Sequence, residues 1–461
     1  MEQPALLNIV RTDTTYRFRL DIPDHPSFGR QEYTTEITSE IRERLRRALQ
    51  SASQHMQTIA VADGKRQTMK MGAVNDSLLL LGHFLFEILL PSPIQEALHN
   101  LDTALILNTN TPTIPWELMF EGNPKSGRFL SHHLSLGRQM NAGREGNQRP
   151  PFSERPARKS GRRETQGLTI LFLVNPTGER HGAEEEVATL CTTLPEVVSR
   201  IILYRQQANQ LEMRMRISSE SPQVIHYAGP FPTTSSTGEP ALALAGNSRL
   251  DGHVVEPLLQ ALPRHPLIFL SSYEEERHGR NGNTLPGQQE REETLELLAS
   301  KLMAAGAGGV VAMRWPVNPL RSREFAVLFY QEVADGVSLG EAMRRTRASM
   351  AKHHPEDTSW MSYMLYGNPT SSLITSSAAS KDRSNDLRFD GFDDDQLFSP
   401  LTSSSSPIER RFLQEVIGLS LLEARRMHKD YLGTPHLFIA LTKLDGGCTQ
   451  DALRTLGFSA K

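Results

Sequence analysis

The sequence has little cysteine and no long apolar run. Of its 461 residues only two are cysteines, Cys191 and Cys448, and they stand far apart. This usage argues against a disulfide framework and fits a reducing compartment. No apolar run approaches the roughly 20 residues that span a bilayer, and the N-terminus lacks the basic and then apolar profile of a signal peptide. We therefore expect a cytoplasmic protein without a membrane partner.

The sequence also lacks a strong net charge and the spacings typical of metal sites. The formal net charge is −3, so no overall basic field attracts nucleic acid, and we expect no such partner. Because no Cys-x-x-Cys, His-Glu-x-x-His or carboxylate cluster with ligand spacing is present, we expect neither a metal nor another cofactor. With 38% hydrophobic and 22% charged residues, a chain of this length can bury a sizeable core and form two or three domains.

Composition divides the chain into five segments. Residues 1–140 carry strand and helix patterns, and residues 141–166 are rich in Arg, Pro and Gly and predict an exposed basic linker. Strand and helix patterns alternate over residues 167–372. Residues 373–406 form a low-complexity, Ser-rich linker, and residues 407–461 have helical spacing.

The order of predicted elements indicates an α/β fold. Before residue 140 we expect a strand at the alternating Tyr16, Phe18 and Leu20, a charged helix near 36–55 and a strand at 104–107. Further strands are expected at 168–174, 201–204, 224–228, 267–270 and 309–313, with a helix at 294–305 and a charged, Gly-rich loop at 274–293. Strands that alternate with helices predict a mainly parallel sheet sandwiched by helices.

Two apolar blocks stand out because each ends in small residues. They are Val-Ile-His-Tyr-Ala-Gly at 224–229, followed by Pro230, and Leu-Ile-Phe-Leu-Ser-Ser at 267–272, followed by Tyr273. Each block predicts a buried strand. In an open α/β sheet, sites form at the carboxyl ends of such strands.

The two blocks resemble the signatures H-[FY]-[AS]-G-H-G and L-[SA]-[SA]-C-E-[ST] of the CHAT family. The members of this family are caspase-like peptidases of bacteria. The Pro-Trp-Glu-Leu motif around Trp116 strengthens the resemblance, which extends over roughly residues 75–370. It implies a caspase-like sheet built from two halves, with Trp116 filling the seam between them. It also implies that the positions of the catalytic histidine and cysteine hold Pro230 and Tyr273, and that Phe231 replaces a glycine.

These replacements remove the chemistry of a cysteine peptidase, which needs a thiolate and a nearby base. Pro230 has no titratable group, and a phenol with a pKa of about 10 is a poor nucleophile toward amides. We therefore expect a pseudoenzyme. A catalytic pair of His226 with either Ser271 or Ser272 remains an alternative. The other interpretation of His226 is a buried, hydrogen-bonded core residue.

An aromatic and acidic stretch lies within the second linker. Its apolar side chains are Phe389, Phe392, Leu397 and Phe398, and aspartates stand among them. This pattern is typical of a short docking peptide that occupies a groove in this protein or another. A solvated acidic linker with incidental aromatics is the alternative.

The C-terminal segment resembles one repeat of the Clp N-terminal domain. The run Tyr-Leu-Gly-Thr-Pro-His-Leu at 431–437 carries the resemblance, which implies a small all-α module that recruits proteins. His436 is the candidate interaction residue. Pro435 stands where Clp domains commonly have a glutamate, so the binding of phosphoarginine that this glutamate assists is not expected. Because one repeat buries little apolar surface, homo-oligomerisation through this module is possible.

Together these features favour a pseudoprotease that acts as an interaction, regulatory or substrate component of a bacterial protease-based defence or cell-death system. Its expected partners are other proteins, namely an active caspase-like protease or a sensor or effector of the same system. Two alternatives stay open. One is an active peptidase with an unorthodox nucleophile, and the other is an adaptor that delivers proteins to a Clp-type AAA+ machine.

Overall fold

The computed structural model describes most of the chain before residue 375. The described residues are 3–23, 29, 31–61, 76–123, 126–140, 167–234, 238–273, 288–355 and 357–374. The basic linker, the aromatic docking stretch, His436 and the predicted C-terminal module lie outside them. The chain forms two compact units, one of Met1–Ala183 with Leu194–Ala378 and one of Glu184–Thr193 with Ala379–Lys461. The second unit is described only within helix α5 (His181–Thr193).

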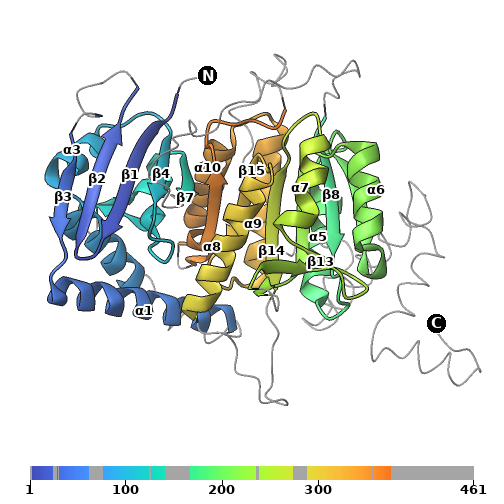
Figure 1. Cartoon of the computed structure of the whole chain (residues 1–461), viewed down its shortest axis with the longest axis horizontal. Coiled ribbons are helices and arrows are strands. Elements are labelled where there is room, and N and C mark those ends of the chain that lie inside the picture. The colour runs from blue at the N-terminus through green and yellow to red at the C-terminus, as the bar shows by residue number, and fades with distance from the viewer. Residues whose placement is uncertain are drawn as a thin grey trace, which may run out of the picture. The chain divides into compact units, whose positions relative to one another are not determined.

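One large sheet organises the first unit (Figure 1). Its described strands follow the order β3-β2-β1-β4-β7-β16-β15-β14-β10-β8-β9. Their bounds are β1 Ala5–Thr12, β2 Thr15–Asp21, β3 Tyr33–Glu36, β4 Leu105–Thr109, β7 Leu136–Met140, β8 Thr169–Val174, β9 Ser199–Tyr204, β10 Val224–Pro230, β14 Leu267–Tyr273, β15 Gly309–Met313 and β16 Tyr363–Gly367. Neighbours pair in parallel except β1 with β2, β2 with β3 and β15 with β16. The predicted mainly parallel sheet is confirmed.

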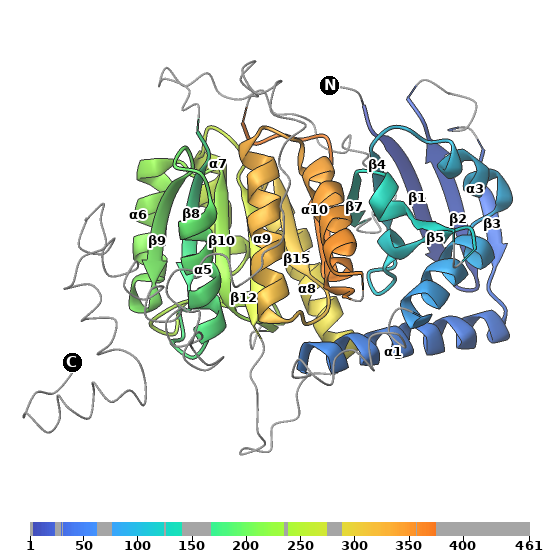
Figure 2. The same ribbon diagram turned by 180° about the vertical axis from the view of Figure 1, so that it is seen from behind.

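Helices cover both faces of this sheet, as Figures 1 and 2 show. The helix bounds are α1 Ser39–Val61, α3 Ser92–His99, α4 Leu130–His133, α6 Gln210–Glu220, α7 Gly252–Ala261, α8 Gln288–Ala304, α9 Pro319–Ala334 and α10 Leu339–His353, with a π-helix η2 at Phe84–Leu89 and 3₁₀ turns η3 Trp116–Leu118, η4 Arg205–Gln207 and η5 Ser359–Ser362. Short strands β5 Phe120–Glu121, β6 Arg128–Phe129, β11 Thr233–Thr234, β12 Pro240–Ala243 and β13 Arg249–Leu250 form two small sheets.

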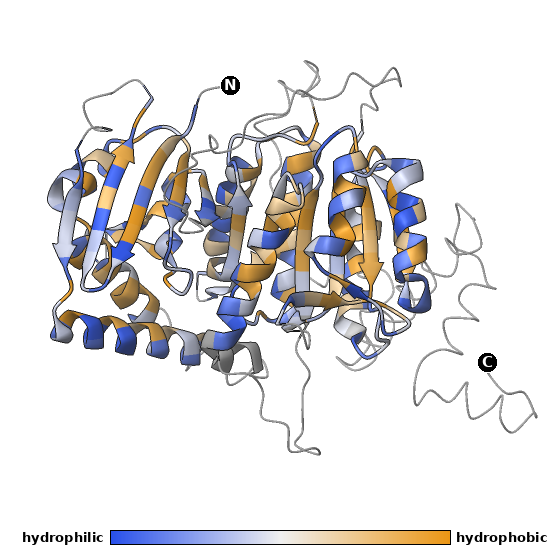
Figure 3. Cartoon of the chain, in the orientation of Figure 1, coloured by the Kyte–Doolittle hydropathy of each residue, from blue (hydrophilic) through white to orange (hydrophobic). Residues whose placement is uncertain are grey.

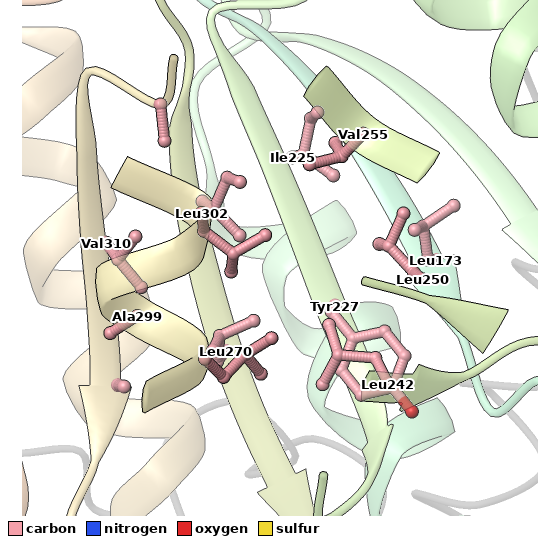
Figure 4. Packing of buried hydrophobic residues seen from close by; sticks show 14 of the residues in the cluster. Leu173, Ile225, Tyr227, Leu242, Leu250, Val255, Leu270, Ala299, Leu302 and Val310 are labelled. Atoms are coloured by element: carbon pink, nitrogen blue, oxygen red, sulfur yellow. The ribbon is translucent and has the colours of Figure 1, made fainter. Parts of the chain in front are cut away.

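The core between the sheet and helices α7 and α8 is built from apolar side chains of both layers. Figure 4 shows Leu173, Ile225 and Tyr227 on the strands beside Val255 of α7 and Leu302 of α8. Apolar residues also dominate the central strands, while polar residues mark the outer faces of the helices (Figure 3). A strand such as β8, apolar at nearly every position, is expected where both faces of a sheet are covered.

Side-chain caps fix where several helices begin. Asn209 accepts a hydrogen bond from the third backbone N–H after it at the start of α6, and Asp251 does the same for α7 at 2.9 Å. Asn318 caps α9, whose first residue is Pro319. Such caps satisfy N–H groups that a helix leaves unpaired. They hold the start of each helix near the end of the strand that precedes it.

Two predicted boundaries need correction. The helix expected at 294–305 begins at Gln288, so the last residues of the expected loop at 274–293 are helical. The charged helix expected near 36–55 begins at Ser39 and runs to Val61. Within the described residues no single helix is long and apolar enough to cross a membrane. One pair of helices, Asp76–Leu89 with Ser92–His99, has the length and composition of a span when the two are taken together, but it is bent by 119°.

Candidate functional site

The two blocks singled out in the sequence form adjacent parallel strands in register. The pairing between β10 and β14 runs from Val224 with Leu267 to Pro230 with Tyr273. The structure therefore brings the backbones of Pro230 and Tyr273 together at the carboxyl ends of both strands. This is the position at which open α/β sheets form sites.

The neighbouring strand β8 ends beside them in a tight turn. The N–H of Asn175 donates to the carbonyl of Ala228 at 2.7 Å, and Asn175 Oδ1 accepts a hydrogen bond from the N–H of Arg180. Asn175 has a φ of +45°, a conformation that asparagine adopts more readily than most residues. The Asn-Pro-Thr-Gly run at 175–178 is a turn signal that could have identified this third member of the strand ends.

Tyr227 fixes the backbone immediately before the site. Its hydroxyl donates to the carbonyls of Ala243 at 3.1 Å and Pro230 at 3.3 Å. Burial raises the pKa of the Tyr227 phenol well above its usual value, so the group stays neutral. A Cβ at Gly229 would lie 2.7 Å from the ring of Tyr227, so a larger residue there would displace the tyrosine. Pro230 adds no N–H to this loop.

Phe231 follows Pro230 directly in the loop after β10. It is half-buried and packs against the core cluster under α7 and α8. The guanidinium of Arg291 lies over its ring, 4.4 Å from the centroid. This cation–π contact joins the loop after β10 to the start of α8.

His226 lies in the core beneath the site. It is fully buried, its Nδ1 lies 2.8 Å from the hydroxyl of Tyr330 on α9, and its ring stacks on Phe269 with centroids 5.0 Å apart. The expectation of a buried, hydrogen-bonded core histidine is confirmed. A base in this position has no contact with solvent in the described structure.

The two serines before Tyr273 lie on opposite faces of the sheet because side chains alternate along a strand. Ser271 is fully buried, and its hydroxyl lies 3.3 Å from that of Ser322 on α9. Ser272 is half-buried and pairs in register with Gly229. Ser271 therefore shares the face of His226 but is enclosed, and Ser272 faces away from the histidine. Neither serine forms an accessible couple with His226.

Buried ion pairs connect the two halves of the sheet next to the site. Arg138 on β7 donates to both carboxylate oxygens of Glu117, at 2.8 and 2.7 Å, and to Glu296 on α8 at 3.0 Å. Burial alone would raise the pKa of Glu117, but the guanidinium of Arg138 outweighs it and the pKa is lowered. For Glu296 burial prevails over Arg138 and Arg314, and its pKa is raised.

Arg314 extends this network. It lies at the end of β15, pairs with Glu292 on the first turns of α8, and donates to the carbonyl of Pro112 at 3.2 Å. The helix that follows the site is therefore anchored to the N-terminal half through charge. These contacts join α8 to the N-terminal half. Trp116 is buried, and its aromatic contacts in the N-terminal half are edge-to-face with Tyr16 and Phe18.

The described residues hold no group of three or more His, Cys, Asp or Glu side chains placed to bind a metal. Among the described residues, the strand ends present a proline, a glycine, a half-buried serine and the backbone of a tyrosine. A proline and a tyrosine backbone supply neither a thiolate nor a base for acyl transfer.

Comparisons with known proteins relate this architecture to a family. Residues 79–368 match the sequence model of the CHAT domain. Tetratricopeptide repeat protein 28 of Homo sapiens is 37% identical over 86 residues, which cover 17% of this chain and 3% of that protein. The protein of the same name from Mus musculus is 37% identical over 89 residues, 17% of this chain and 4% of that protein.

Solved structures of the separase–securin complex of Saccharomyces cerevisiae are also similar. One matches with a TM-score of 0.45 at 10% identity, over 79% of this chain and 30% of that chain. A second matches with a TM-score of 0.42 at 8% identity over the same shares. The chain thus spans a small part of each curated relative and under a third of the structural ones.

Proposed function

Because the chain belongs to the CHAT domain family, we propose that it is a caspase-like protein without peptidase activity that acts by binding other proteins. The family match covers residues 79–368, and the strand ends of this region are where a caspase-like peptidase would act.

The pairing of Pro230 with Tyr273 carries this proposal. If these are the positions of the family's histidine and cysteine, the base and the nucleophile are both replaced. Removing one member of a catalytic unit costs orders of magnitude in rate, and the members act as one unit. A phenol with an unperturbed pKa of about 10 does not substitute for a thiolate near neutral pH.

The surroundings of these positions support retention of the scaffold. Tyr227 still holds the loop after β10, and Arg138 with Glu296 still joins the two halves. A buried arginine between two carboxylates requires a well-ordered surrounding. A rigid fold without the reacting groups is suited to presenting a binding surface.

An unorthodox peptidase is the weaker candidate. Its histidine would be His226, which is buried against Phe269 and Tyr330, and its nucleophile would be Ser271 or Ser272. A general base must come within hydrogen-bond reach of the proton it removes from a bound substrate. The burial of His226 and Ser271 and the opposite direction of Ser272 argue against such a complex.

We propose that the protein acts in the bacterial cytoplasm, as a component of a defence or cell-death system. Its partner would be an active caspase-like protease, or a sensor or effector of the same system. The aromatic stretch with Phe389, Phe392, Leu397 and Phe398 is the docking segment in this proposal.

The module at 407–461, with His436, recruits partners or a second copy. Delivery to a Clp-type AAA+ machine is the alternative use of the same module, and its Pro435 argues against recognition of phosphoarginine.

The experiment is affinity capture with the full chain, followed by mass spectrometry of the captured proteins. We expect the full chain to capture an uncleaved partner. This capture should be lost when residues 407–461 are deleted, and also in the double variant Leu397→Ala with Phe398→Ala. The matched control is Leu401→Ala, which lies outside the aromatic stretch. Recovery of a partner cut at a defined bond, with the cut abolished by Ser272→Ala, would contradict the proposal. Capture of an AAA+ unfoldase would favour the adaptor alternative.

A further inference from the structure

Buried polar atoms without a hydrogen-bond partner gather where helix α10 meets α4 and the turn η5. Helix α10 packs against both elements, and the ring centroid of His132 on α4 lies 4.1 Å from that of Trp360 in η5. Among the described residues these unpartnered atoms are His132 Nε2, Ser131 Oγ, Thr346 Oγ1, Arg347 Nη1 and Ser362 Oγ. Each of them can donate a hydrogen bond. Native structures leave few such groups unsatisfied, so this group requires a physical account.

Arg347 is the charged member of the group. Its side chain lies inside the protein, with a relative exposure of 2%. One end of the guanidinium, Nη2, donates to the carbonyl of Tyr363 at 2.6 Å, while Nη1 has no protein partner. Burial lowers the pKa of Arg347 to about 10, against the opposing effect of the Glu117 carboxylate, so the group stays charged near neutral pH. A buried charge is costly unless a counter-charge and hydrogen bonds compensate it.

The carboxylates of this region are engaged by other arginines. Both oxygens of Glu117 accept hydrogen bonds from Arg138, at 2.8 and 2.7 Å. On α10 both oxygens of Glu341 accept from Arg344, at 2.7 and 2.6 Å. Neither carboxylate forms a hydrogen bond with Arg347 in the described structure. The guanidinium therefore lacks a protein acceptor with a negative charge at Nη1.

His132 indicates the sign of the electrostatic potential at this point. Arg344 donates to the His132 carbonyl at 3.2 Å, which holds α4 on α10. Burial, and then the charges of Arg347 and Arg344, lower the pKa of the His132 ring to about 4. The ring is therefore neutral near pH 7, and the tautomer that carries its proton on Nε2 can donate there. Positive charge and uncompensated donors together favour an anion over a cation.

We propose that Arg347 Nη1 and His132 Nε2 bind a small monovalent inorganic anion such as chloride, enclosed by α4, α10 and η5. The hydroxyl of Ser131, next to His132, is a further donor in the same elements. Hydrogen bonds between a guanidinium and an anion are charge-assisted and stronger than neutral ones. The surrounding side chains are buried, Trp360 among them, so an anion as large as phosphate would force α4, α10 and η5 apart.

The first test is denaturation of the full chain at constant ionic strength, with gluconate exchanged stepwise for chloride. We expect a saturating gain with a dissociation constant on the order of 10 mM, so that about 100 mM chloride raises the ratio of folded to unfolded chain roughly tenfold. Arg347→Gln should abolish this gain. The matched control is Arg345→Gln on the same helix, which removes exposed pairs with Glu341 and Glu332 and should keep the gain. A wild type indifferent to chloride, or an equal gain in both variants, would overturn the proposal.

The second test needs no variant to fold. Crystals of the wild type soaked in bromide should show anomalous density within hydrogen-bonding distance of Arg347 Nη1. A water molecule in that place, or bromide on the surface only, would overturn the proposal. Bound chloride should also raise the pKa of His132, followed by NMR, because an anion favours the protonated ring. A pKa that is the same in chloride and in gluconate would contradict the site. Peptidase activity plays no part in these measurements, so the inference is tested separately from the proposed function.

Discussion

Pro230 and Tyr273 are paired in register at the carboxyl ends of adjacent parallel strands. Two residues that are 43 positions apart in the sequence thus share the place where this fold would carry out catalysis. Tyr227 donates a hydrogen bond to the carbonyl of Pro230 and so holds the end of β10.

Breaking the buried ion pairs between the two halves should destabilise the fold strongly. Arg138→Gln leaves Glu117 and Glu296 buried without their guanidinium partner. We expect the free energy of unfolding to fall by about 3–5 kcal/mol, measured by chemical denaturation. The matched control is Arg128→Gln, which removes a partly exposed pair with Glu121 and should cost less than about 1 kcal/mol. Equal effects of both variants would show that the network does not join the halves.

His226 should matter for stability through its contact with Tyr330. Tyr330→Phe removes the hydroxyl 2.8 Å from His226 Nδ1 in a fully buried setting. We expect a loss of about 1–3 kcal/mol in the free energy of unfolding. Tyr33→Phe on the exposed edge strand β3 should change it by less than about 0.5 kcal/mol. An unchanged stability of Tyr330→Phe would mean that the histidine is not held as described.

Acid should weaken the protein through His132. Burial, and then the charges of Arg347 and Arg344, lower the pKa of His132 to about 4 from 6.5. Above pH 6.5 the ring is neutral in both states and its contribution is complete. As the pH falls toward 4, only the unfolded chain takes up the proton, so stability is lost in this window. Between pH 7 and pH 5 the loss should be about 2 kcal/mol.

The matched variant for this titration is His132→Phe, which keeps an aromatic ring against Trp360, whose centroid lies 4.1 Å away. Denaturation at both pH values should show a smaller difference for this variant than for the wild type by about 2 kcal/mol. The carboxyl of Glu341, whose pKa is lowered to about 2 by Arg344 and Arg345 against the effect of burial, titrates below this window. An identical pH dependence in the variant would assign the acid sensitivity elsewhere.

Much of the sheet could be predicted from the sequence because buried strands carry a local signal. The run at 224–228 and the run at 267–270 are continuous apolar stretches between turn residues, and both are strands. The beginning of α8 was missed because its first turns, from Gln288, are almost entirely polar. A run of polar residues at the start of a helix has the composition of a loop, so the sequence alone does not show that it is helical.

The seam between the halves could not be predicted from the sequence. Glu117, Arg138 and Glu296 are far apart along the chain, and only the packing of α8 on the N-terminal half unites them. The place of Trp116 at the seam stays a prediction; its edge-to-face partners Tyr16 and Phe18 lie on β2. Charge pairing of this kind depends on long-range contacts that no local pattern contains.

Incubation of the purified full chain with a diverse peptide library, with products identified by mass spectrometry, tests the absence of catalysis most directly. We expect no cleavage above that of a buffer control, because the ends of β10 and β14 present Pro230 and Tyr273. Ser272→Ala and Tyr273→Phe should behave as the wild type does. Cleavage by the wild type that either variant abolishes would contradict the assignment of this protein as a pseudoprotease.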